Sequence, residues 1–117
     1  MARIIEKELS FVKITLTVTE LGNDINILVS GGTSHIGCCV LAQPRPSLKK
    51  DGSLSSTASV INVIGHKDEE ICRYIAEKVA AKKNTIVVCC GGIHIDNITA
   101  KQIEELHMLV SSLVEEI

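Results

Sequence analysis

The chain has 117 residues, of which 45% are hydrophobic, 22% charged and 2% aromatic, with a formal net charge of −2. This length suits one compact domain over residues 1–117, and no apolar run reaches the ~20 residues that a membrane-spanning helix needs. The acidic balance and the near absence of aromatic side chains argue against a nucleic-acid-binding protein, which uses clustered Lys and Arg and stacking platforms. The early charges at the N-terminus do not resemble a secretory signal, so we expect a cytoplasmic protein.

The first half of the chain has the pattern of strands. Apolar and polar residues alternate over residues 11–19, which predicts a half-buried antiparallel strand, and again over residues 25–29. Residues 36–42 form a nearly continuous apolar run, which predicts a central strand buried on both faces. A further strand is predicted over residues 57–64.

The segment 43–56 interrupts this pattern. Pro44 and Pro46 disfavour a central strand, and Asp51-Gly52 is a turn signal, so we expect a long loop.

The second half predicts two helices with one strand between them. Acidic residues that follow Gly65-His66 suit a helix N-terminus, and apolar residues continue at helical spacing until Asn84. Residues 85–90 read as a short strand, and a capping box at 99–102 starts a helix that runs to the end. The order β-β-β-β-α-β-α predicts a single α+β (or α/β) domain, a mixed sheet with the two helices packed on one face.

Five cysteines and no export signal make a disulfide framework unexpected. Cys38-Cys39 and Cys89-Cys90 are adjacent pairs, and neighbours on a strand point to opposite faces. We therefore expect reduced packing residues, with a metal or redox role as the alternative.

Three of the four histidines lie beside glycines at predicted strand ends. The segments are 31–37, 65–66 and 91–97. If these ends meet, His35, His66, His94 and Asp96 provide the nitrogen and oxygen donors that zinc or another divalent transition metal takes. The spacing matches no compact metal motif, and the alternative is that these side chains cap turns and hydrogen-bond to backbone. His107, on the final helix, is expected to be structural or solvent-facing.

Gly31, Gly32, Gly91 and Gly92 expose backbone that can approach a ligand or bind an anion. Neither pair belongs to a phosphate-loop or Rossmann fingerprint. Arg45, with two lysines nearby, makes the 43–56 loop basic, so it is either a solvated loop or a clamp for a phosphate or carboxylate.

Two runs of sequence, Pro-Arg-Pro-Ser-Leu at 44–48 and Gly-Ile-His-Ile-Asp-Asn-Ile-Thr at 92–99, accompany the histidine segments. Together they resemble the small D-subunit family of gallate and hydroxyarylic acid decarboxylases, the prenylated-flavin chaperones, over roughly residues 10–115. The resemblance implies a noncatalytic homodimer that binds prenylated FMN and delivers it to a UbiD-like decarboxylase. It also implies metal-assisted binding through His35, His66, His94 and Asp96, with Arg45 as the candidate for the flavin phosphate.

Two other functions fit the same residues. One is an assembly-chaperone-like homodimer that binds no cofactor and whose glycines only make turns. The other is a metal-assisted hydrolase that uses the histidines with water as a further ligand. The sequence contains no nucleophile–base arrangement and no enzyme signature, which favours a noncatalytic role.

Overall fold

The computed structural model describes residues 2–64 and 69–117. Within these ranges the elements follow in the order β1 (Ala2–Leu9), β2 (Val12–Leu21), β3 (Asp24–Gly32), β4 (Cys38–Pro46), β5 (Leu54–Asn62), α1 (Glu69–Lys83), β6 (Val87–His94) and α2 (Ala100–Glu115). The predicted α+β domain with a mixed sheet and two helices is confirmed. No helix in the described residues is long and apolar enough to cross a membrane.

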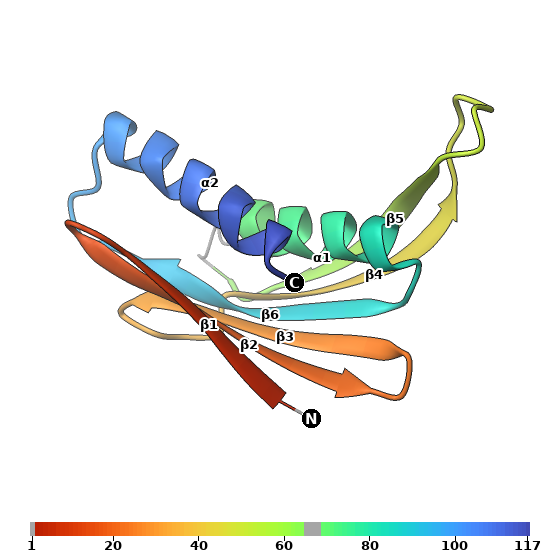
Figure 1. Cartoon of the computed structure of the whole chain (residues 1–117). Helices are drawn as coiled ribbons and strands as arrows, with labels where there is room; N and C mark the ends of the chain where they lie inside the picture. The colour runs from red at the N-terminus through yellow and green to blue at the C-terminus, as the bar shows by residue number, and fades with distance from the viewer. Residues whose placement is uncertain (1, 65–68) are drawn as a thin grey trace.

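The sheet has the strand order β1-β2-β3-β6-β4-β5. Strand β6, late in the chain, lies between β3 and β4, and it is parallel to β3 and antiparallel to β4. Both helices cover the same face of the sheet (Figure 1), α1 over β4, β5 and β6 and α2 near β1. One face of the sheet is therefore packed, and no described helix covers the other.

The core lies between the sheet and the helices. Alternate residues of β2 point into it, and Ile14 and Leu16 are fully buried. On α1, Ile75 and Val79 are fully buried, as is Leu113 on α2. The residues between them on β2, such as Thr17, lie on the uncovered face, which explains the polar–apolar alternation in the sequence.

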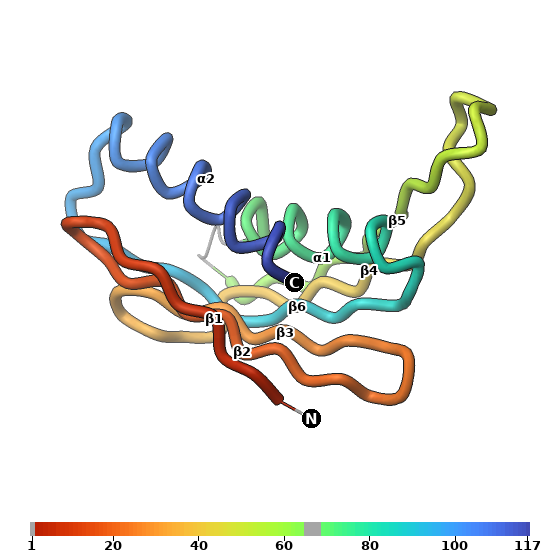
Figure 2. The backbone as a smooth tube through the Cα atoms, viewed as in Figure 1, coloured from red at the N-terminus to blue at the C-terminus, as the bar shows by residue number. Residues whose placement is uncertain are grey.

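The loop predicted over residues 43–56 is shorter in the structure, where residues 47–53 connect the two strands. β4 runs through Pro46 and pairs with β5 in a hairpin whose register joins Gln43 to Thr57 and Pro46 to Leu54. The prolines are tolerated because β6 ends its pairing with β4 at Ala42. Beyond that point β4 has one neighbour only, so the missing N–H groups of Pro44 and Pro46, two residues apart, can face the unpaired side. Figure 2 shows this hairpin extending away from the body of the domain.

Two further expectations need correction. The edge strand β1 was not predicted, because its alternation is hidden by adjacent Ile4 and Ile5 and by its charges. β4 is not buried on both faces: Val40 is fully buried, whereas Leu41 is 36% exposed on the uncovered face.

One-sided burial predicts unequal costs for two leucine truncations. Leu16→Ala removes a fully buried side chain and should lower the free energy of unfolding by about 2–5 kcal/mol. Leu28→Ala truncates a side chain that is 50% exposed on the other face and should cost about 1 kcal/mol or less. Urea unfolding of both variants measures the difference, and equal losses would contradict a sheet packed on one face.

Candidate functional site

The ends of β3 and β6 meet at one end of the sheet. In their parallel register Ser30 lies opposite Gly92 and Gly32 opposite His94. The Thr33 backbone N–H then donates to the His94 carbonyl at 3.0 Å, which extends the pairing beyond β3. The two glycine-containing segments, 60 residues apart in sequence, therefore lie side by side.

Close backbone contact explains two of the glycines. Gly32 has φ +64, and a Cβ there would lie 2.0 Å from the His94 carbonyl oxygen. Gly91 has φ +125, and a Cβ there would lie 2.0 Å from the Val29 carbonyl oxygen. Both positions need glycine for the strand pairing itself. Their presence is accounted for by packing, and the anion-binding role stays a prediction.

Two of the predicted histidines are neighbours. The rings of His35 and His94 have centroids 6.4 Å apart and an interplanar angle of 80°. His94 Nε2 lies 3.0 Å from Asp96 Oδ1, and the His94 and Asp96 side chains are 57% and 85% exposed. The structure thus gathers two imidazoles and a carboxylate at the open end of the sheet. We call His35, His94 and Asp96 the histidine cluster.

Hydrogen bonds to oxygen acceptors indicate which ring nitrogens carry protons. His35 Nδ1 lies 3.0 Å from the Thr33 carbonyl oxygen, which can only accept, so Nδ1 is the donor and Nε2 has the lone pair of the neutral ring. His94 Nε2 faces the Asp96 carboxylate in the same way, which leaves the lone pair of its neutral ring on Nδ1. The Thr33 carbonyl is a positioning group that the sequence does not reveal, because it belongs to the backbone.

The fourth predicted ligand, His66, lies outside the described residues. Across residues 2–64 and 69–117, no three His, Cys, Asp or Glu side chains are arranged around one point as a ready-made metal site. The side chains of the histidine cluster lie near one another without surrounding a common point. Their role as a metal site stays a prediction.

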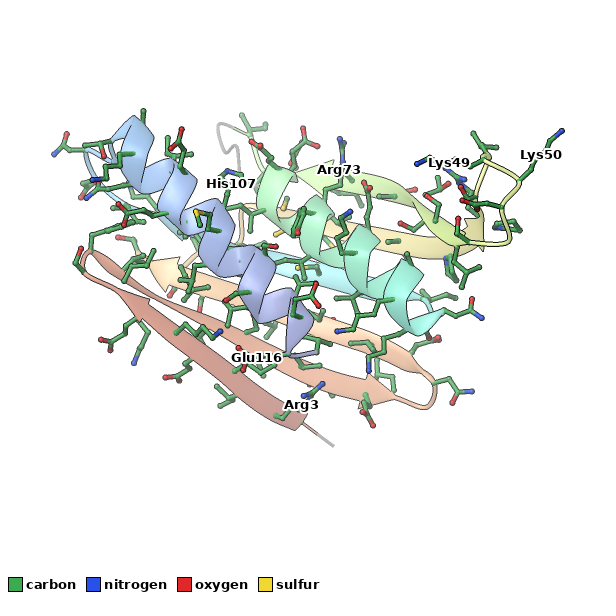
Figure 3. The ribbon with its side chains drawn as sticks, turned by 45° about the horizontal axis from the view of Figure 1, so that its top comes forward. Arg3, Lys49, Lys50, Arg73, His107 and Glu116 are labelled. Carbon is green, nitrogen blue, oxygen red and sulfur yellow. The ribbon has the colours of Figure 1, made fainter. Side chains whose placement is uncertain are left out.

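Arg45 is far from the histidine cluster within one chain. Cys38, at the start of β4, lies opposite Gly91, and Arg45 is seven residues further along the strand. At ~3.3 Å per residue this is about 23 Å. Arg45 instead donates from Nε to Thr57 Oγ1 at 2.8 Å and from Nη1 to the Pro46 carbonyl at 3.1 Å. Figure 3 shows Lys49 and Lys50 at the tip of the same hairpin.

His107 lies apart from this cluster, on α2, where Figure 3 shows it beside α1. Its Nε2 is 3.9 Å from the Glu70 carboxylate, and its side chain is 42% exposed.

The cysteines divide between the two faces of the sheet, as expected for adjacent strand residues. Cys38 and Cys89 are buried under the helices, whereas Cys39 and Cys90 are half-buried on the uncovered face. Cys39 and Cys90 are direct register partners, and their sulfur atoms lie 3.0 Å apart. Burial, with the hydrogen bond to Cys39, raises the pKa of the Cys90 thiol to about 12.

Comparison with known families shows which family the sequence matches. A family model described as "Prenylated flavin chaperone LpdD-like domain" matches residues 9–117. The chain belongs to this family. The resemblance drawn from the histidine segments and the Pro-Arg-Pro-Ser-Leu run is therefore confirmed.

A solved structure has a similar fold. It is titled "Crystal Structure of a Novel Chaperone Complex for Yeast 20S Proteasome Assembly", and its matching chain is 12% identical, with a TM-score of 0.59. The match covers 98% of this chain and 92% of that chain. At this identity the likeness concerns the fold alone. A comparison with curated proteins finds no match.

Two glycines with the same backbone angle test the close contact between β3 and β6. Gly22 has φ +63 and nothing within 4 Å of the position that a Cβ would take, whereas at Gly32 the Cβ would meet a backbone oxygen. Gly22→Ala should cost about 1–2 kcal/mol of unfolding free energy from the left-handed backbone alone. Gly32→Ala should cost about 1–3 kcal/mol more, because the strands must separate. Equal losses in chemical denaturation would contradict the contact.

Proposed function

We propose that this chain is a noncatalytic chaperone that binds prenylated FMN with the help of a divalent transition metal and passes it to a UbiD-like decarboxylase. Membership of the prenylated-flavin chaperone family supports the cofactor class. The observation that carries the site is the approach of His35 to His94 beside Asp96 at the end of β3 and β6. The cofactor supplies decarboxylation chemistry in the partner enzyme, and the chaperone supplies binding and release.

The donor chemistry of the histidine cluster suits a divalent transition metal. At a tetrahedral zinc ion with Zn–N bonds of about 2.0–2.1 Å, two imidazole ring centroids lie roughly 5 Å apart. The His35 and His94 centroids are 6.4 Å apart, so the two rings have to move about 1 Å closer together to hold one ion. We propose His35, His94 and Asp96 as ligands, with His66 as the further donor; the ion would replace the proton between His94 Nε2 and Asp96 Oδ1, which lie 3.0 Å apart. Their exposure leaves room for an oxygen of the cofactor as another ligand.

A loosely held flavin fits a transfer chaperone. Phe11 and Tyr74 are the chain's aromatic residues, and Tyr74 donates its hydroxyl to Ser111 between the helices. The isoalloxazine therefore has to rest on peptide or aliphatic surface. Of the four predicted glycines we propose that Gly32, which is exposed, contributes backbone there, since Gly31, Gly91 and Gly92 are buried in the sheet. Such a surface binds without aromatic stacking, which favours release of the cofactor.

We propose a homodimer as the working form. Arg45 is too far from the histidine cluster of its own chain to reach the same flavin, because about seven residues of extended strand separate them. A second copy can bring its Arg45 to the phosphate and cover the exposed cofactor. Arg45→Ala should therefore weaken binding only in the dimer.

A cofactor-free interaction protein is the second candidate. It is favoured by the apolar side chains on the uncovered sheet face, among them Leu28 and Leu41, which are 50% and 36% exposed. Under this alternative, replacing all histidines leaves partner binding intact.

The hydrolase alternative requires turnover that disappears with His94→Ala.

Metal content tests the proposed ligands. Wild-type protein loaded with Zn²⁺ and gel-filtered should retain about one ion per chain, and a His35→Ala/His94→Ala variant should lose it, because two of its nitrogen donors are gone. His107→Ala is the matched control, since this histidine lies on α2 and faces Glu70, and it should retain the ion. Elemental analysis by mass spectrometry gives the result. Equal metal in the double variant and the wild type would contradict the site.

Flavin titration tests whether binding of the cofactor depends on the metal. Metal-loaded protein should bind reduced prenylated FMN, and removal of the metal by a chelator should weaken this binding at least about tenfold, because the bond from the ion to a cofactor oxygen is lost and about 1.4 kcal/mol suffices for that factor. Anaerobic calorimetry measures both affinities. Binding of neither metal nor flavin would overturn the proposal in favour of the interaction protein.

A further inference from the structure

The uncovered sheet face carries a pair of thiols that the cofactor site does not use. Cys39 on β4 and Cys90 on β6 face each other across the antiparallel ladder, with Sγ–Sγ 3.0 Å. In the same lateral row lie Leu28 on one side and Ile61 on the other. The two sulfur atoms therefore meet inside an apolar strip of the sheet.

The backbone geometry allows these sulfur atoms to bond. Directly opposite residues of an antiparallel pair have Cα atoms about 4.5–5.5 Å apart. Disulfides span Cα separations of about 4.4–6.8 Å. Cys38 and Cys89 do not share this relation, since Cys38 lies opposite Gly91 and Cys89 opposite Val40. Of the four strand cysteines, only Cys39 and Cys90 are therefore register partners that a disulfide can join.

We propose that Cys39 and Cys90 form a redox-active dithiol that small disulfides, of the glutathione type, convert to an intrachain disulfide between β4 and β6. The Cys39 thiolate attacks one sulfur of the small disulfide, whose S–S bond breaks and releases one thiolate. Cys90 then loses its proton to solvent and attacks Cys39 in the mixed disulfide, releasing the second thiolate. Two protein thiols are oxidised by two electrons, and one small disulfide is reduced to two thiols.

The hydrogen bond assigns different roles to the two sulfur atoms. Cys90 donates its S–H to the Cys39 sulfur. Burial and this bond raise the pKa of Cys90 to about 12, so Cys90 stays protonated at neutral pH. Cys39 is therefore the attacking sulfur and Cys90 the resolving one.

The disulfide would join the strand that carries the glycines and His94 to its neighbour. Gly91 and Gly92 follow Cys90 directly, and β6 ends at His94. Oxidation thus adds a covalent link between β4 and β6 immediately before the candidate site. This inference does not depend on the identity of the cofactor.

Thiol counting on the full chain tests the proposal. Protein is incubated with glutathione disulfide at pH 8, denatured, and labelled with N-ethylmaleimide, and its mass is measured. The five cysteines of reduced protein take five labels. Oxidised wild type should take three labels and run as a single chain on a non-reducing gel.

Variants identify the sulfur atoms. Cys90→Ser should accumulate a glutathione adduct on Cys39, whereas Cys39→Ser should stay unmodified, and Cys72→Ala, which alters a buried thiol on α1, should behave as wild type. Three outcomes overturn the proposal. They are five labels after oxidation of the wild type, an intrachain disulfide that persists in Cys39→Ser, and a disulfide between two chains.

Discussion

Backbone contact between β3 and β6 decides what lies at the open end of the sheet. The parallel register brings Gly32 against His94, and the Thr33 N–H continues the pairing past the end of β3. The chain then turns so that His35 returns toward His94. A side chain at position 32 or 91 would push the strands apart, because each Cβ would meet a backbone oxygen. The same contact that closes the sheet therefore brings the two imidazoles together.

Because the described helices cover only one face of the sheet, neighbouring residues on one strand lie in different environments. Helix α1 packs over β4, β5 and β6 and buries Cys38 and Cys89 with the core. The opposite side chains of the same strands, including Cys39 and Cys90, remain half-buried. Adjacent residues on one strand thus have unlike environments, one in the apolar core and one open to reagents and partners. A small chaperone can keep a stable core and still expose binding surface in this way.

The fold could be predicted from the sequence where hydrophobic periodicity was clear. It could not be predicted where pairing between strands determines the structure. Alternation over residues 11–19 and the capping box at Thr99 located β2 and α2, because burial and capping are local. Pro44 and Pro46 misled the prediction, since only the sheet topology shows that β4 has a free side there. That His35 and His94 lie together could not be predicted from the sequence, because it depends on the parallel register of β3 and β6. Arg45 was assigned to the same flavin because the sequence does not show that β4 runs away from the cluster.

The metal environment tests the central claim most directly. X-ray absorption spectroscopy of zinc-loaded protein measures which atoms bind the ion and at what distance. The account predicts a shell of nitrogen and oxygen atoms at about 2.0–2.1 Å, with the scattering pattern of at least two imidazoles. A shell containing sulfur at about 2.3 Å would place the ion on the cysteines instead. That result, or a shell without imidazole, would contradict the histidine cluster as the metal site of this chaperone.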